Sequence, residues 1–98
     1  MRDAGRVRLR LRGDLDLAGA PTLNRHLRTL RERGETVLLD LDELAFIDMS
    51  GLRAVLAGAE AGSRNGGPFS VTRGSSSVRR LFELVRLDGQ LPLDGSSG

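Results

Sequence analysis

Cysteine and lysine are both absent from this 98-residue sequence, and histidine occurs only once, as His26. Without cysteine the chain has no disulfide, no thiolate nucleophile and no cysteine zinc site. One histidine leaves no room for a multi-histidine metal site, so we expect neither a metal nor a cofactor, and we place His26 on the surface. The only aromatic residues are Phe46, Phe69 and Phe82, each at a position where a core residue is expected.

The charge is nearly balanced overall but is distributed unevenly. All 15 basic residues are arginine, against 13 acidic residues, and the net charge is +2. Nine of the arginines precede residue 34, where only four acids occur, so the first third of the chain is basic and the rest is acidic. Because no aromatic residues are interleaved with these arginines, a base-stacking surface is missing. We therefore expect a solvated strand face and no nucleic-acid partner.

Long apolar runs are also missing. No stretch approaches the roughly 18 apolar residues of a membrane span, and no segment is typical of a signal peptide. These absences predict a cytoplasmic protein with no membrane insertion. The length predicts a single domain over residues 1–98, of which residues 94–98 form a flexible tail.

Hydrophobic periodicity predicts an alternation of strands and helices. Period-two patterns predict strands over residues 6–12, 36–41 and 69–72, and a last short strand over 90–93. Helical spacing predicts three helices that begin near Pro21, Ser50 and the serines at 75–77, with a strong turn at 65–68 before the third strand. The apolar stripes of these helices are Leu23, Leu27 and Leu30; Leu52, Val55, Leu56 and Ala59; and Val78, Leu81, Phe82 and Val85.

This order implies crossover connections and an α/β fold with a small, mostly parallel or mixed sheet of four to five strands. Strands buried on both faces are usually continuous apolar runs, whereas these strands alternate. We therefore expect three or more helices packed mainly on one face, with Arg8, Arg10 and Asp40 on the wetter side.

The segment at the start of the second helix carries the strongest functional candidate. After a loop through residues 46–48, Ser50 is predicted to cap the helix, which by itself is a structural role. Gly51 leaves the hydroxyl uncovered, Asp48 holds the turn with its carboxylate, and the helix dipole stabilises an anion there. A phosphoryl group on Ser50 would therefore be tolerated by the fold and would change the surface charge.

Residues 46–52, FIDMSGL, resemble the phosphorylation-site signature of the STAS domain family. Residues 12–23, RGDLDLAGAPTL, look like the second strand and first-helix entry of that family, and residues 75–88, SSSVRRLFELVRLD, look like its third helix. Together with the strand at 38–41, the resemblance covers about residues 7–93 in the right order.

The resemblance implies a STAS-like fold and a small bacterial regulatory module, an anti-sigma-factor antagonist. In that family the unphosphorylated antagonist binds an anti-sigma factor that is itself a serine kinase and frees a sigma factor. Phosphorylation at the position of Ser50 abolishes binding, and a serine phosphatase reverses it. The partner-binding residues implied here are Asp14, Asp16, Asp48, Met49, Gly51 and Arg53.

Two alternatives stay open from the sequence. The chain could be a STAS subunit of a larger stress-signalling or lipid-transporter complex. It could also be a small serine hydrolase that uses Ser50, but no lysine or second histidine is present to activate a serine, so we expect no enzyme. Small residues on the second helix, Ala54, Ala57, Gly58 and Ala61, favour either packing within the domain or partner docking. The oligomeric state is left open between a monomer and a weak dimer.

Overall fold

The computed structural model of the chain describes residues 2–3, 5–65 and 69–84. The elements in chain order are β1 (Arg2–Asp3), β2 (Arg6–Arg10), β3 (Gly13–Leu15), α1 (Ala20–Glu32), β4 (Val37–Asp40), β5 (Leu44–Ile47), α2 (Met49–Asn65), β6 (Phe69–Val71) and α3 (Ser76–Leu84). The predicted strand at 90–93, the tail at 94–98, most of the turn at 65–68 and the stripe position Val85 lie outside the described residues.

The described strands form two small sheets. In the larger sheet the order is β1-β2-β4-β6, in which β2, β4 and β6 run parallel and β1 is antiparallel to β2. The smaller sheet pairs β3 with β5, again in parallel. The predicted α/β class and mostly parallel pairing are confirmed, but the sheet is split rather than continuous.

The split occurs at the end of the first predicted strand. β2 stops at Arg10 instead of Arg12, and Gly13 follows with a positive φ of 76°. Glycine adopts this left-handed conformation readily, and it turns the chain out of the extended direction. A register shift between Gly13 and Asp14 accompanies the turn. The chain therefore leaves β4 and pairs with a different strand, β5.

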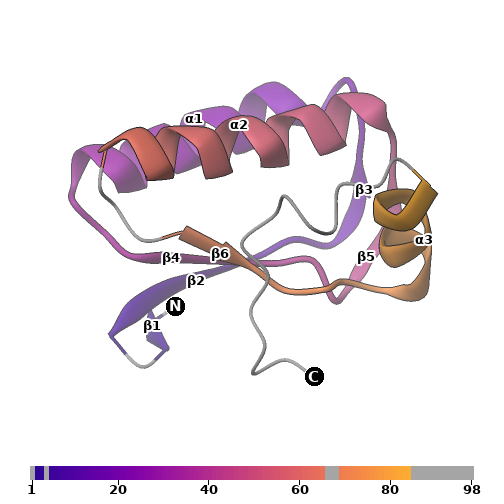
Figure 1. The fold of residues 1–98 in the computed structure, drawn as a ribbon, viewed down its shortest axis with the longest axis horizontal. Coiled ribbons are helices and arrows are strands. Elements are labelled where there is room, and N and C mark those ends of the chain that lie inside the picture. The colour runs from indigo at the N-terminus through magenta and orange to yellow at the C-terminus, as the bar shows by residue number, and fades with distance from the viewer. Residues whose placement is uncertain (1, 4, 66–68, 85–98) are drawn as a thin grey trace.

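Two helices cover one face of the larger sheet, as predicted, and the third lies at the end of the molecule beside β5 (Figure 1). Helix α1 contributes Leu23 and Leu27 to the core, and α2 contributes Leu52 and Val55. The sheet supplies inward-facing residues such as Leu39. Val78 and Phe82 of α3 are buried as well, while Leu81 is half-buried. The three predicted apolar stripes are thus confirmed over the described residues.

The small residues of α2 allow it to approach α1. A Cβ added at Gly58 would lie 2.8 Å from Leu27 Cδ1 and 3.3 Å from Phe69 Cζ. Ala54 and Ala61 are also buried, while Ala57 is exposed. Packing within the fold accounts for the buried members of this stripe.

The back of the larger sheet holds a buried carboxylate. Asp40 lies with Arg8 and Arg10, as expected, but it is only 2% exposed, so the expectation that it is in contact with solvent is wrong. The Arg8 guanidinium donates to its Oδ2 at 2.8 Å, Arg10 Nε lies 3.5 Å from the same oxygen, and the Asp42 N–H donates to Oδ1 at 2.9 Å. These long side chains reach across from β2 and cover the carboxylate, while both arginines keep partial contact with solvent.

Burial by itself raises the pKa of Asp40, but its partners have the larger combined effect. The backbone N–H of Asp42 and the guanidiniums of Arg8 and Arg10 favour the charged form, and the pKa of Asp40 falls below its ordinary value. Asp40 is therefore ionised at neutral pH and tied into the structure. Across residues 2–3, 5–65 and 69–84, no helix has both the length and the apolarity to cross a bilayer.

Candidate functional site

Helix α2 is capped by Asp48. The carboxylate Oδ1 of Asp48 accepts a hydrogen bond of 2.9 Å from the Gly51 N–H, and the Asp48 carbonyl accepts the Leu52 N–H at 2.9 Å. These are the contacts of an N-cap residue, so the prediction that Ser50 caps the helix is wrong. The expectation that Asp48 holds the turn is confirmed. The physical reason is position: Asp48 lies three residues before Gly51 and just outside the helix.

Ser50 therefore lies in the first turn of α2 and does not cap the helix. It is half-buried, and its hydroxyl forms no hydrogen bond with any residue in the described part of the chain. The amino end of a helix stabilises negative charge, because backbone N–H dipoles point toward it. The site therefore combines an uncommitted hydroxyl with a local field that favours an anion.

Gly51 allows close packing between the start of α2 and strand β3. It is buried, and a Cβ at this position would clash with the Leu15 carbonyl oxygen and lie 2.8 Å from Leu15 Cγ. The Asp48 N–H also donates to that carbonyl, at 3.2 Å. Strand β3 thus rests directly on the start of α2. This contact joins the loop after β3 to the turn that carries Ser50.

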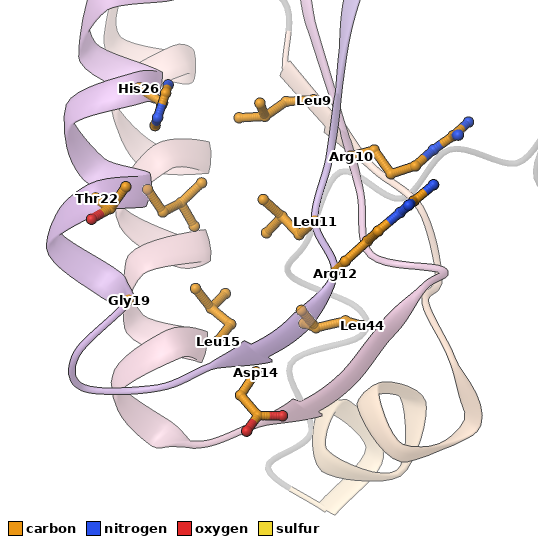
Figure 2. A pocket seen from close by; sticks show the side chains of 11 residues that line it. Leu9, Arg10, Leu11, Arg12, Asp14, Leu15, Gly19, Thr22, His26 and Leu44 are labelled. Carbon is orange, nitrogen blue, oxygen red and sulfur yellow. The ribbon is translucent and has the colours of Figure 1, made fainter.

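Asp14 lies within strand β3 and Asp16 follows it, so the loop expected over residues 14–16 begins only after Leu15, and the two acids differ in their surroundings. Asp16 Oδ1 accepts the N–H groups of Ala18 and Gly19, both at 3.1 Å, so its carboxylate holds the loop in shape. Asp14 is exposed, and Figure 2 shows its carboxylate directed away from α1. Of the two predicted contact residues, Asp14 is the one whose carboxylate forms no hydrogen bond or ion pair with another described residue.

Exposed apolar side chains lie at the same end of the molecule. Phe46 is 50% exposed, Met49 43% and Leu17 74%. The pairing of Asp14 with Phe46 and of Leu15 with Ile47 makes β3 and β5 end together, so the segments that carry Leu17 and Met49 leave the small sheet on the same side. We call Leu17, Phe46 and Met49 the apolar rim.

Two of these three residues were missed from the sequence. Phe46 was expected in the core, but Leu44 and Ile47 of β5 take the buried positions, so that prediction is wrong. The loop expected over residues 46–48 is largely strand β5, because β3 provides a pairing partner. Leu17 had a weak signal, as an apolar residue between the loop acid Asp16 and the turn before α1.

Arg53 lies three residues after Ser50, on the same side of α2. It is exposed and forms no ion pair with other residues that the structure describes. A phosphate on Ser50 would therefore have a guanidinium within reach of the same helical face. The predicted site residues at the start of α2 thus lie next to strand β3, which carries Asp14.

Catalytic chemistry finds little support at this site. No base contacts the Ser50 hydroxyl among the residues described, whereas a serine nucleophile needs a neighbouring base. Within the same part of the chain, no cluster of three histidine, aspartate or glutamate side chains could hold a metal ion.

The site thus belongs to a small α/β fold in which strand β3 packs against the start of α2 beside the exposed apolar rim. The sequence profile described as "Mlab, STAS domain" matches residues 2–93, and the chain belongs to the STAS domain family. The anti-sigma-B factor antagonist of Bacillus subtilis (strain 168) is 23% identical over 91 residues, which cover 93% of this chain and 84% of that protein.

Solved structures share the fold. An anti-sigma factor antagonist from Mycobacterium paratuberculosis superposes with a TM-score of 0.83 at 23% identity, over 97% of this chain and 81% of that one. The Bacillus cell fate determinant SpoIIAA in its phosphorylated form gives a TM-score of 0.72 at 23% identity, over 96% of this chain and 85% of that one. At these identities the likeness establishes the architecture.

Proposed function

We propose that this chain is an anti-sigma-factor antagonist whose partner binding is switched off by phosphorylation of Ser50. In the unphosphorylated state it binds a serine-kinase anti-sigma factor and thereby releases a sigma factor. Family membership and the antagonist role of its relatives support the general role. The observation that carries the switch is Ser50, which is half-buried and whose hydroxyl forms no hydrogen bond in the described chain.

The surroundings of Ser50 explain how one phosphate could control binding. The apolar rim buries itself only when a partner covers it, and that partner excludes water from the neighbouring hydroxyl. A phosphate adds about −1.5 to −2 charges, and burying such a charge without a matched partner costs several kcal/mol. On the free protein the same phosphate stays hydrated, next to the helix amides and Arg53. Phosphorylation therefore weakens partner binding far more than it destabilises the fold.

The capping arrangement protects the fold from the modification. Because Asp48 and not Ser50 accepts the Gly51 N–H, phosphorylation removes no capping bond. The helix start keeps its structure in both states. A serine phosphatase that hydrolyses the phosphoester restores the binding surface, and this cycle operates in the cytoplasm, where the sigma factor is found.

The direct test is to incubate the chain with a serine-kinase anti-sigma factor and ATP, and to locate phosphate by mass spectrometry. We expect one phosphate on Ser50, no labelling of Ser50→Ala, and unchanged labelling of Ser76→Ala. Ser76 is a matched control because it is exposed and also begins a helix.

Binding is measured on the same proteins. Wild type is expected to bind the anti-sigma factor, and the phosphorylated form is expected to bind at least about 100-fold more weakly, in line with an unpaired charge in an interface. Equal affinity of both forms would refute the switch. An unlabelled chain that co-purifies stably within a larger assembly would instead support the role of a STAS subunit.

A further inference from the structure

Helices α1 and α2 lie side by side on the larger sheet, and their outer faces form one side of the molecule (Figure 1). Arg25, Arg28 and Arg31 of α1 follow one another at intervals of three residues, which makes them neighbours on the helix surface. Arg25 and Arg28 are exposed, and Arg31 is half-buried. We call these three residues the arginine row. None of them belongs to the site around Ser50.

The arginines of β2 and those of the arginine row have different electrostatic surroundings. Arg8 and Arg10 reach the buried carboxylate of Asp40, and Arg12 lies 3.3 Å from Glu43. No member of the arginine row forms an ion pair with a residue that the structure describes. Because like charges at this spacing repel each other, the row lowers the stability of the helix slightly. The fold thus neutralises the arginines of the strand but not those of the helix.

Local structural roles account for only part of the arginine row. Arg31 lies in the last turn of α1, where the helix dipole favours a positive charge. Arg25 and Arg28 lie in the middle of the helix and gain nothing from the dipole. Arg25 donates one long hydrogen bond of 3.4 Å to the Thr22 hydroxyl, and Arg28 has no bonded partner in the described chain. These two guanidiniums are therefore available to groups of another molecule.

A small exposed residue of α2 borders the arginine row. A Cβ at Gly58 would lie 2.8 Å from Leu27 Cδ1, so these two positions meet between the helices. Their sequence neighbours Ala57 and Arg28 are both exposed and therefore lie at the same level of the helix pair, on its outer side. The single methyl group of Ala57 leaves room for the backbone of a third helix to approach. Packing within the fold does not account for this alanine, because it is exposed.

The charge pattern indicates which kind of acidic partner fits. Glu32 is exposed and follows Arg28 by one helical turn. Nucleic acids and anionic membranes present only negative charge, whereas a protein helix can present carboxylates to the arginines and one basic side chain to Glu32. None of the large apolar side chains that are exposed in the described chain lies on α1, so this helix has no apolar anchor for a bilayer. The surface therefore favours a protein helix.

We propose that the outer face of α1 and α2 binds an acidic helix of a partner protein. Carboxylates at intervals of three and four residues on a helix are about 5–6 Å apart, the same spacing as the arginines of the row. Each guanidinium can hold a carboxylate through two parallel hydrogen bonds. The partner helix lies over Ala57 and places a basic residue near Glu32. This contact uses no residue of the Ser50 site, so it is independent of the proposed phosphorylation switch.

A synthetic helical peptide tests this proposal on the full chain. The peptide has about 20 residues, enough to form a helix in water. It carries glutamates at intervals of three and four residues on one face, alanine elsewhere and one lysine after the last glutamate. The control peptide has the same composition, with its glutamates spread around the helix. At low salt we expect the one-faced peptide to bind at least about fivefold more tightly. Equal binding of the two peptides, or no binding, overturns the proposal.

NMR of the arginine side chains locates the bound peptide. The Nε–Hε signals of Arg25 and Arg28 should shift during the titration. Those of Arg8 and Arg10 should stay, because these guanidiniums are held by Asp40. Equal shifts of all exposed arginines would mean non-specific attraction and would overturn the assignment to α1.

Charge reversal tests the same surface by affinity. The double variant Arg25→Glu/Arg28→Glu is expected to weaken peptide binding about tenfold or more. The matched control Arg79→Glu/Arg80→Glu makes the same charge change on exposed positions of α3 and should change the Kd less than about twofold. Ala57→Gln should also weaken binding, since its longer side chain occupies the space above the two helices. Circular dichroism checks that each variant is folded. Equal weakening by both double variants contradicts the proposal.

Other occupants of this surface are tested in parallel. The probes are vesicles of phosphatidylglycerol and phosphatidylcholine in equal parts, and a duplex DNA. Tighter binding of either than of the peptide, lost in Arg25→Glu/Arg28→Glu, would assign the surface to a membrane or a nucleic acid and overturn the protein partner. Self-association of the chain alone, lost in the same variant, would assign it to a second copy.

Discussion

The larger sheet and the small β3-β5 pair use polar and apolar residues in opposite ways. In the larger sheet Asp40 is buried and bound by Arg8, Arg10 and the Asp42 amide. At the end of the small sheet, the Ser50 hydroxyl forms no hydrogen bond in the described chain, and Phe46 stays half-exposed. Buried groups that are bonded to their neighbours stabilise a fold, whereas exposed groups without such contacts are available to a partner. Substitutions in the first region should therefore change stability, and those in the second should change binding.

Leu39→Ala should have the largest effect on stability. Leu39 is fully buried in β4, beneath the helices, and its truncation leaves a cavity. We expect a loss of about 3 kcal/mol in the free energy of unfolding, measured by urea denaturation. Leu17→Ala is the control, since this leucine is 74% exposed and should lose less than about 0.5 kcal/mol. Similar losses for both leucines would remove the distinction between the two regions.

Gly51→Ala tests a tightly packed contact next to Ser50. The new Cβ meets the Leu15 carbonyl, so β3 or the start of α2 must shift. We expect a loss of about 2 kcal/mol by urea denaturation, together with weaker binding of the anti-sigma factor. Ser50→Ala, one position earlier, should change stability by less than about 0.5 kcal/mol. A Gly51→Ala protein as stable as wild type would show that the contact between position 51 and the Leu15 carbonyl does not require glycine.

The pH dependence of stability in the Asp40→Asn variant tests the role of the buried carboxylate in the larger sheet. The pKa of Asp40 is lowered in the folded state, so its carboxylate stabilises the fold when the pH is above the ordinary aspartate pKa. That contribution is lost as the pH falls from the ordinary value through the lower folded value. We expect Asp40→Asn to lose about 1–2 kcal/mol at neutral pH and to show a flatter acid limb, in urea titrations between about pH 7 and pH 3.

The matched carboxylate for this experiment is Asp14, which is exposed. Asp14→Asn should leave both the neutral stability and the acid limb of wild type in place. A wild-type acid limb in the Asp40→Asn variant would mean that other groups account for the acid sensitivity.

Phe46→Ala should have the smallest effect on stability and a clear effect on binding. Half of the ring is already exposed, so the free energy of unfolding should change by about 0.5 kcal/mol or less. If the apolar rim anchors the partner, affinity for the anti-sigma factor should fall about tenfold or more by calorimetry. Leu84→Ala, at an exposed leucine of α3, is the control that should leave affinity unchanged.

Helical spacing predicted the helices well because their core contacts lie on a single face. Leu23 and Leu27, like Val78 and Phe82, are buried where the spacing placed them. The errors concern residues whose environment comes from distant segments. β5 was expected to be a loop because its pairing partner β3 lies some thirty residues earlier. Asp40 was expected to be solvated because the alternation of one strand does not show that arginines of another strand cover it.

The position of Asp48, Ser50 and Gly51 at a helix start was predicted correctly, but the residue that caps the helix was not. The sequence placed Asp48, Ser50 and Gly51 at a helix start, since a polar cap followed by glycine and an apolar stripe is a local pattern. Which oxygen caps the helix depends on where the first turn begins, and the contact of β3 with Gly51 and Asp48 fixes that point.

The sequence by itself determined the α/β alternation, the parallel pairing and the location of the phosphorylation candidate, because each follows from local periodicity and local polar signals. Only the tertiary structure decided that Asp40 is buried, that Phe46 is exposed and that the Ser50 hydroxyl is left without a bond in the described chain. These properties depend on contacts with residues that are distant in the sequence, and a local sequence pattern does not show which distant residues come into contact.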